Sequence, residues 1–239
     1  MIDRIAPSNR PKGPNDGTQS WRSLLFSHWE IPVSSLRSRL PDGLEIDTYD
    51  GRAFIAVVPF KMRNIRPRWL PHSFAIDFLE INVRTYVLYN GKPGVYFFSL
   101  DANSRLAVWA ARTSWSLPYR YSQLCATQAA PLNVYDCERP RGNVRHRVSF
   151  RVDKQIGTCL PGTLEHFLLE RYLMFLEHKG RIYSGQVHHS PYPVFTAAID
   201  FLQDDLIGAS GLPAINRPPD ITYYSPGVDV EVFGMRVQL

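Results

Sequence analysis

The chain has 239 residues, of which 44% are apolar and 21% are charged, an ordinary globular balance that suits one large domain. No stretch approaches the roughly 18 apolar residues of a membrane-spanning helix, and three cysteines without CxxC spacing argue against a disulfide framework or a zinc knuckle. The net charge of +5 comes from 22 arginines and 5 lysines against 22 acidic residues, and most of it is scattered, which makes it a weak signal for nucleic acid.

The N-terminal residues 1–20 are polar and rich in Pro, Gly and Asn. They contain no apolar segment of the kind that a secretion signal needs, so we expect a soluble, cytoplasmic protein without membrane association. Residues 21–239 show no internal repeat and no linker. We therefore predict a polar N-terminal arm at residues 1–20 and a single domain at residues 21–239.

The first third of the predicted domain consists of strands joined by turns. Strand patterns occur at residues 21–29, 44–49 and 53–62. Pro32 suits the first turn of a short helix within residues 31–40. Asp50-Gly51 predicts a tight hairpin turn between the second and third of these strands.

The longest alternating pattern, at residues 74–89, has two different faces. One face is apolar and carries Leu79, Ile81, Val83 and Val87. The other face carries Phe78, Glu80, Asn82, Arg84 and Tyr86. Because successive side chains of a strand point to opposite faces, the second set lies side by side on one surface. Residues 95–100 and 106–115 predict the next two strands of an antiparallel meander.

The second half of the chain adds more strands and one predicted long helix. Residues 144–152 alternate strictly, and Arg145, Arg147 and Arg151 share one side. Thr163 and Gly180 suit the N-cap and the C-terminal end of a helix at residues 164–179. Residues 181–189 and 228–237 predict strands. The pattern as a whole indicates an α+β, mainly antiparallel β domain with a few helices.

Several segments recur in the order that is typical of one protein family. They are residues 78–86, 94–102, 111–112, 117–119, 169–172 and 187–191. These segments resemble an uncharacterised family, of unknown function, among the acetoacetate-decarboxylase-like proteins. The resemblance implies a closed, cone-like antiparallel β-barrel with a few outer helices and a pocket inside.

The same resemblance implies where decarboxylase chemistry would reside. Acetoacetate decarboxylase has a carboxylate on an interior strand, to which Glu80 is similar, and two lysines after a proline. In this sequence the lysine positions fall at Tyr119 and Arg120. An imine needs a neutral amine in a dry pocket, and of the five lysines only Lys61 ends an apolar strand. We therefore do not expect decarboxylation through a Schiff base.

The residues themselves suggest acid–base groups and an anion site. Glu80 and His188 are the candidate catalytic groups, although the sequence leaves open whether His188 or His189 faces the pocket. The candidate substrate-binding residues are Asn82, Arg84, Ser99, Arg112, Tyr119, Arg120 and Tyr121. We predict no metal site, because adjacent strand residues such as His188 and His189 point to opposite faces.

Each candidate has a structural alternative. Glu80 and Arg84 also suit a solvated sheet face or separate structural pairs inside the barrel. An Asp101–Arg112 pair between strands is more typical of a structural latch than of a catalytic pair. The arginine face of residues 144–152 is the best candidate for nucleic acid, but a solvated sheet face is the favoured interpretation.

We predict a pocket protein that binds a small anionic metabolite, an organic acid, without a cofactor. Whether it is an enzyme stays open at this stage; lyase or hydrolase-like acid–base chemistry without a Schiff base fits Glu80. The alternative is a non-catalytic ligand-sensing or protein-interaction module. Nucleic acid is a disfavoured partner, and the sequence leaves self-association into a homo-oligomer open.

Overall fold

The computed structural model describes residues 2–238, apart from the side chain of Ser114. Met1 and Leu239, the outermost residues of the predicted arm and domain, lie outside the described residues. Within this range a 13-stranded sheet has the order β1-β3-β4-β5-β10-β11-β13-β12-β9-β8-β7, with β2 paired to β4 and β6 paired to β5.

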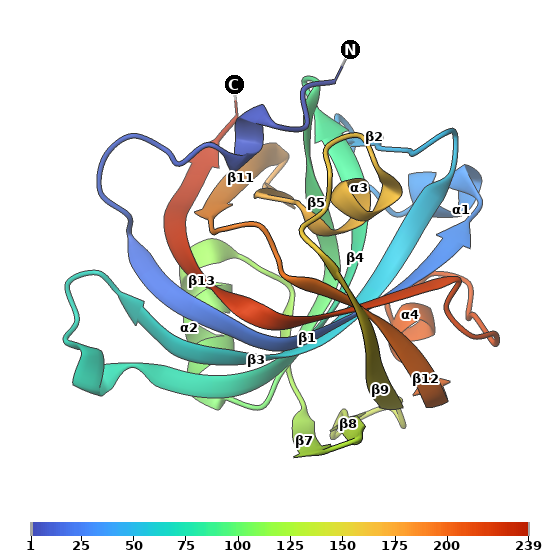
Figure 1. The fold of residues 1–239 in the computed structure, drawn as a ribbon. Helices are drawn as coiled ribbons and strands as arrows, with labels where there is room; N and C mark the ends of the chain where they lie inside the picture. Colours follow the sequence, from blue (N-terminus) through green and yellow to red (C-terminus); the bar gives the residue numbers. More distant parts are fainter. Residues whose placement is uncertain (1, 239) are drawn as a thin grey trace.

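Seven strands close into a barrel because β1 pairs with β3 on one side and with β13 on the other (Figure 1). The barrel strands are β1 (Gly17–Ile31), β3 (Ala53–Pro67), β4 (Ile76–Tyr89), β5 (Lys92–Ala102), β10 (Leu173–His178), β11 (Arg181–His188) and β13 (Ile221–Val237). All neighbours in the barrel are antiparallel except β5 and β10. The predicted closed, mainly antiparallel barrel is confirmed.

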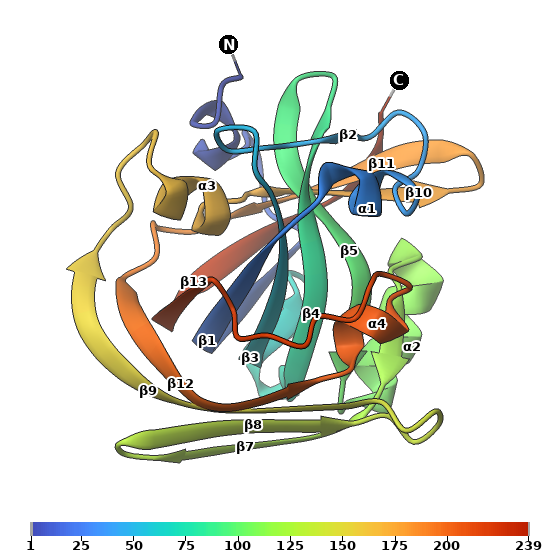
Figure 2. The ribbon, with the colours of Figure 1, turned by 90° about the vertical axis from the view of Figure 1, so that its right-hand side faces the viewer.

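The sheet continues past β13 as an extension that curves under the barrel (Figure 2). Its strands are β12 (Val194–Asp204), β9 (Arg145–Gly157), β8 (Leu132–Glu138) and β7 (Gln123–Ala129). Two short strands, β2 (Glu45–Ile46) and β6 (Tyr119–Tyr121), lie beside β4 and β5. β6 is the strand that brings Tyr119 next to the barrel.

The helices are short and surround the barrel (Figures 1 and 2). They are α1 (Val33–Arg37), α2 (Arg105–Trp115), α3 (Leu164–Leu169) and α4 (Leu206–Ala209), with 3-10 turns η1 (Ala6–Ser8) and η2 (His72–Phe74). Pro32 is the N-cap of α1, one position before the first turn in which the sequence places it. Across residues 2–238 no helix has the length and apolar character that crossing a bilayer requires.

Strand alternation separates two apolar cores. Even-numbered β3 residues such as Phe54 and Phe60 join Phe26 of β1 and Phe167 of α3 in the interior core. The neighbouring odd-numbered residues face outward, where Ile55, Ile81 and Val83 pack against Leu36 of α1 and Ile207 of α4. The apolar face predicted for residues 74–89 is thus the outer face of β4, and the face with the polar residues is the interior one.

The predicted helix at residues 164–179 is wrong beyond its first turns. Thr163 is the N-cap, and its hydroxyl accepts a hydrogen bond from the His166 amide. The helix ends at Leu169, and Leu173–His178 forms strand β10, which pairs with β5 and β11. Lys179 and Gly180, both with positive φ, make the hairpin turn to β11. Because apolar residues lie on both faces of this strand, its sequence pattern fits a helix as well as a strand. Pairing with β5 and β11 is what makes the segment a strand.

The predicted strand at residues 106–115 is also wrong, because this segment forms helix α2. The Ser104 hydroxyl accepts a hydrogen bond from the Ala107 amide and caps the helix. Three alanines, the best helix formers, lie within the segment at positions 107, 110 and 111. Val108 is buried against the barrel, while Leu106 and Trp109 remain exposed.

The seam between β1 and β13 makes a first testable prediction. A Cβ atom at Gly227 would lie 2.0 Å from the Trp21 carbonyl oxygen, and the φ of Gly227 is +128°. Gly227→Ala is therefore expected to lower the free energy of unfolding by about 2 to 4 kcal/mol in urea unfolding. Gly208→Ala is the control, because its Cβ would meet Ala214 at an ordinary 3.6 Å. A Gly227→Ala variant as stable as the wild type would contradict this tight seam.

Candidate functional site

Strand β4 carries a row of polar side chains into the barrel. Glu80, Asn82 and Arg84 are 3%, 5% and 9% exposed, and they alternate with outward-facing Ile81 and Val83. They follow one another at every second position, so the strand itself lines them up along the interior. The structure therefore brings together these three predicted site residues.

Arg84 is a buried cation without an anion. Among residues 2–238 no carboxylate lies within 4.0 Å of its guanidinium, and its Nε has no hydrogen-bond partner. One Nη atom donates a long hydrogen bond of 3.4 Å to the Leu168 carbonyl oxygen. The guanidinium carbon lies 5.5 Å from the ring centroid of Phe26 and 6.0 Å from that of Tyr86. Ring faces attract a cation but replace only part of its lost hydration.

The histidine beside Arg84, His28, adds no charge to the interior. His28 is fully buried, and its Nε2 lies 2.9 Å from the Tyr86 hydroxyl, which donates to the Leu168 carbonyl oxygen. Burial, and then the charge of Arg84, lower the pKa of His28 to about 3. His28 is therefore neutral at physiological pH, and Arg84 keeps the only charge of this pair.

Glu80 forms an acid–base pair with Tyr119. The Tyr119 hydroxyl donates a hydrogen bond of 2.6 Å to Glu80 Oε2. Burial raises the pKa of Glu80 to about 7, against the hydrogen bonds from Tyr119 and Asn82, which lower it, while the Asp101 charge raises it further. Burial and the Glu80 charge raise the pKa of Tyr119 well above its usual range. A carboxyl group that titrates near neutral pH is suited to general acid–base catalysis.

The interior also contains His189, while the predicted catalytic residue His188 faces away. His188 lies under the N-terminal arm, with its Nδ1 3.1 Å from the Ser8 carbonyl oxygen. His189 is 3% exposed and stacks on Tyr172 at 4.5 Å between ring centroids. Burial lowers the pKa of His189 to about 4. Of the two histidines, His189 is thus the one that reaches the interior.

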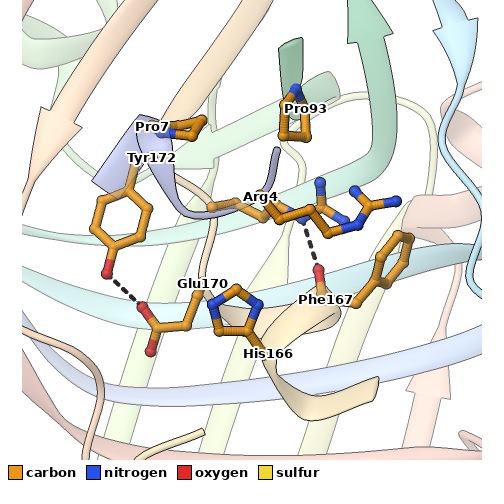
Figure 3. A pocket seen from close by; sticks show the side chains of 8 residues that line it. Arg4, Pro7, Pro93, His166, Phe167, Glu170 and Tyr172 are labelled. Atoms are coloured by element: carbon orange, nitrogen blue, oxygen red, sulfur yellow. Dashed lines mark hydrogen bonds between the residues drawn. The ribbon is translucent and has the colours of Figure 1, made fainter. Parts of the chain in front are cut away.

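A small pocket, with room for about one water molecule, lies at the end of the barrel under the N-terminal arm (Figure 3). Its lining residues are Arg4, Pro7, Pro93, His166, Phe167, Glu170, Arg171 and Tyr172. Asp47, buried beside it, pairs with Arg4 at 2.5 Å and with Arg171 at 2.8 Å. Glu170 accepts a hydrogen bond of 2.5 Å from Tyr172, and burial raises the pKa of Glu170. One wall of this pocket is the Tyr172 ring that stacks on His189.

Four other predicted residues lie elsewhere or at the margin. Ser99 is buried on the outer face of β5, within a cluster around Asp101. Arg112 is exposed on helix α2, and Arg120 is exposed on β6. Tyr121 packs against the interior core, with the Arg105 guanidinium 4.4 Å from its ring centroid. The interior site therefore excludes Ser99, Arg112 and Arg120.

The predicted Asp101–Arg112 latch is wrong in its partner. Arg139 donates two hydrogen bonds of 2.7 Å to the Asp101 carboxylate, and the Ser122 hydroxyl donates a third. Arg112 lies in a helix rather than on a neighbouring strand, so no strand register pairs it with Asp101. The latch joins the loop after β8 to the barrel strand β5.

The arginine face of β9 is matched by carboxylates. Arg145, Arg147 and Arg151 pair with Glu138, Asp136 and Asp200 at 3.1, 3.1 and 2.6 Å. These acids lie on the flanking strands β8 and β12, directly beside the arginines. The pairing supports the interpretation of a solvated sheet face rather than a nucleic-acid surface.

Sequence reasoning missed several interior groups. His28 and Trp21 lie on the interior face of β1. Alternation with Phe26 is a usable signal for His28, whereas Trp21 is out of step with it because β1 is irregular at Ser23, where φ is +56°. Arg139 follows β8 in a segment without periodicity, and no pattern in the sequence identifies it as the partner of Asp101. Glu170 belonged to a predicted helix, which concealed its place at the barrel end.

Arg84 and Arg139 make a matched pair for a stability test, since each is 9% exposed. Arg84→Met removes an unpaired charge and is expected to leave the free energy of unfolding unchanged or higher. Arg139→Met leaves the Asp101 carboxylate buried and unpaired, and is expected to cost about 3 to 5 kcal/mol. Urea unfolding of both variants measures the difference. Equal losses would show that Arg84 is as well compensated as Arg139.

Glu80 makes a prediction about pH. Since its folded-state pKa of about 7 lies above the ordinary 4.5, the folded state keeps a proton that the unfolded chain releases. Stability therefore falls as pH rises from about 4.5 through 7, by roughly 3 kcal/mol in all. Glu80→Gln has no carboxyl group to ionise and does not lose this stability. The free energy of unfolding of the variant, measured with urea, should therefore rise relative to that of the wild type between pH 5 and pH 8. Tyr119→Phe, which removes a hydrogen bond that lowers the pKa, should move the fall to higher pH. A pH-independent advantage would contradict the raised pKa.

Comparison with known proteins identifies the family. Residues 18–229 match DUF2071, which is described as an uncharacterized conserved protein. The chain is 36% identical to the uncharacterized protein YqjF of Bacillus subtilis (strain 168) over 220 residues, which are 91% of this chain and 90% of that protein.

Solved structures share the fold at low sequence identity. The enduracididine biosynthesis enzyme MppR in complex with pyruvate has a TM-score of 0.65 and 14% identity, covering 94% of this chain and 91% of that one. Acetoacetate decarboxylase from Legionella pneumophila has a TM-score of 0.65 and 11% identity, covering 100% and 96%. An acetoacetate decarboxylase-like enzyme from Sphingomonas wittichii RW1 has a TM-score of 0.64 and 10% identity, covering 95% and 94%. The chain therefore belongs to the uncharacterized DUF2071 family, and its fold is that of the acetoacetate-decarboxylase-like proteins.

Proposed function

We propose that this protein binds a small organic acid inside the barrel, with the carboxylate of the ligand on Arg84. The observation that carries the proposal is the buried guanidinium, which has no carboxylate within 4.0 Å in the described part of the chain. A buried charge costs several kcal/mol unless it is paired. A planar carboxylate supplies the missing charge and accepts hydrogen bonds from Nε and Nη together.

The relatives in the fold support an acid as ligand. MppR was solved with pyruvate bound. Pyruvate is a small keto acid whose carboxylate is of the kind that a guanidinium binds. It is therefore the natural first probe for this barrel.

Imine chemistry does not fit the lysines of this chain. All five lie within residues 2–238, and none is buried. Lys61, the one lysine at the end of an apolar strand, points outward and donates a hydrogen bond of 2.6 Å to Gln128. Tyr119, at the position that the resemblance assigns to a lysine, donates to Glu80 instead. A phenol cannot form a Schiff base.

Acid–base chemistry on the bound acid fits better. Glu80 exchanges a proton near neutral pH, and Tyr119 holds a second proton on the same oxygen. Arg84 lies four residues after Glu80 on the same face of β4 and binds the carboxylate of the ligand. Glu80 takes or gives a proton at a carbon or oxygen of the ligand. The proposal is thus an enzyme of proton transfer that does not use a covalent intermediate with lysine.

The test is thermal unfolding against pyruvate, acetoacetate and a series of aliphatic carboxylates. A ligand that binds only the native state stabilises it by about 2.7 kcal/mol at a hundred times its Kd. We expect the melting temperature to rise with at least one acid, and the rise to vanish in Arg84→Met but to persist in Glu80→Gln.

The same ligands then report on proton transfer. In D2O, the exchange of ligand C–H protons followed by NMR should be catalysed by the wild type and lost in Glu80→Gln. Thermal shifts without exchange or turnover would favour the non-catalytic ligand-sensing alternative. If no acid shifts the melting temperature, the anion site is refuted.

A further inference from the structure

Two polar atoms on neighbouring rings inside the barrel lack partners. Trp21 Nε1 and His189 Nε2 are buried and make no hydrogen bond to any described residue. The two rings lie 5.5 Å apart between centroids and are tilted by 59°. An unsatisfied buried polar atom costs about 1 to 3 kcal/mol, and here two of them occur side by side.

The hydrogen-bonding role of each atom is fixed by its chemistry. An indole N–H only donates. His189 Nδ1 lies 2.8 Å from the Ser190 carbonyl oxygen, which only accepts, so Nδ1 carries the proton of the neutral ring. Burial lowers the pKa of His189 to about 4, which keeps the ring neutral at physiological pH. His189 Nε2 is therefore an acceptor, and the pair consists of one free donor and one free acceptor.

The pair is part of the same interior as Arg84. The His189 ring lies 4.7 Å from the Tyr192 ring, and the Tyr192 ring lies 5.5 Å from the ring of Phe26. The Arg84 guanidinium lies 5.5 Å from that Phe26 ring. On the other side, the Trp21 ring lies 6.2 Å from Phe60, the strand partner of Glu80. The pair thus belongs to the same interior as Arg84 and Glu80, with the Tyr192 and Phe26 rings between it and Arg84.

We propose that the ligand is a hydroxy acid, whose hydroxyl group accepts from Trp21 Nε1 and donates to His189 Nε2 while its carboxylate lies on Arg84. The inference rests on the proposed function and specifies its substrate class. A hydroxyl group satisfies both atoms at once, because it donates one hydrogen bond and accepts another. A ketone accepts only and leaves His189 unpaired, and an ammonium group donates only and leaves Trp21 unpaired.

Asn82 adds a second acceptor along the same interior. Its side chain contributes a hydrogen bond that lowers the pKa of Glu80, and its Oδ1 has no partner among residues 2–238. A ligand with a hydroxyl group has a donor to offer, and a further hydroxyl group would serve Oδ1. The free groups therefore favour a hydroxylated acid over a keto acid of the same carbon skeleton.

The experiment compares acids that differ only at one carbon. Lactate, pyruvate and propionate form one set; 3-hydroxybutyrate, acetoacetate and butyrate form a second; and 4-hydroxyvalerate, levulinate and valerate form a third. Calorimetric Kd values for the wild type should favour the hydroxy acid of at least one set by about tenfold or more over both its partners. This comparison needs no variant, so it does not depend on how a substitution affects folding.

Three variants then locate the preference. Trp21→Phe and His189→Phe should each reduce the tenfold preference to less than about threefold, while binding of the simple carboxylate changes little. His188→Phe is the matched control, since this neighbouring ring faces the N-terminal arm, and it should retain the preference. Circular dichroism checks that each variant is folded.

The outcomes separate the two proposals. Equal Kd values for hydroxy and keto acids, with binding that still depends on Arg84, would overturn the hydroxy-acid inference and leave the proposed acid site standing; a buried water molecule would then satisfy Trp21 and His189. A preference that survives His189→Phe would also overturn the inference. Binding of no acid at all would refute the proposed function itself.

Discussion

The pairing of β1 with β13 is the constraint on which the rest of the structure depends. Because it joins the first barrel strand to the last, every second side chain of seven strands projects into one enclosed space. A polar side chain placed there cannot turn to bulk water and must find a partner inside. The close approach at Gly227, where no Cβ fits, shows how tightly this seam is packed. Barrel closure is therefore the reason that Glu80, Asn82 and Arg84 of β4 are buried.

Two equally buried arginines show what closure does to charge. Arg139 lies outside the barrel and meets Asp101 in a two-bond ion pair, which ties a loop to β5. Arg84 lies inside, among Phe26, Tyr86 and the neutral His28, where no described carboxylate reaches it. In the first arrangement the charges of Arg139 and Asp101 compensate each other, and the ion pair stabilises the fold. The second leaves a buried charge without an anion among the described residues, and the proposed function assigns that missing anion to a ligand.

The interior divides its chemistry between its two halves. Near β6, Glu80 and Tyr119 share a short hydrogen bond, and burial brings the carboxyl group to a pKa at which it exchanges protons at neutral pH. Toward the end of the barrel under the N-terminal arm, His189 is neutral and the Arg84 Nε atom has no hydrogen-bond partner within residues 2–238. In the proposed function, an acid lies between these halves, with its carboxylate on Arg84 and its reactive carbon near Glu80. None of the five lysines among the described residues is buried, so the interior lacks the amine that imine chemistry needs.

The sequence by itself determined the mainly antiparallel β class, and strict alternation over residues 74–89 placed Glu80, Asn82 and Arg84 on one face of β4. The closed barrel was an expectation from the family resemblance, and barrel closure decided that this face is the interior one. Tertiary structure decided the rest. Residues 173–178 became a strand rather than a helix, since apolar side chains on both faces satisfy either period until β5 and β11 offer their backbone groups. Tertiary structure also chose between His188 and His189, turned Ser99 outward and gave Asp101 its partner Arg139. Alternation along one strand is a local property that a sequence records, whereas strand pairing, barrel closure and ion pairs depend on residues far apart in the chain.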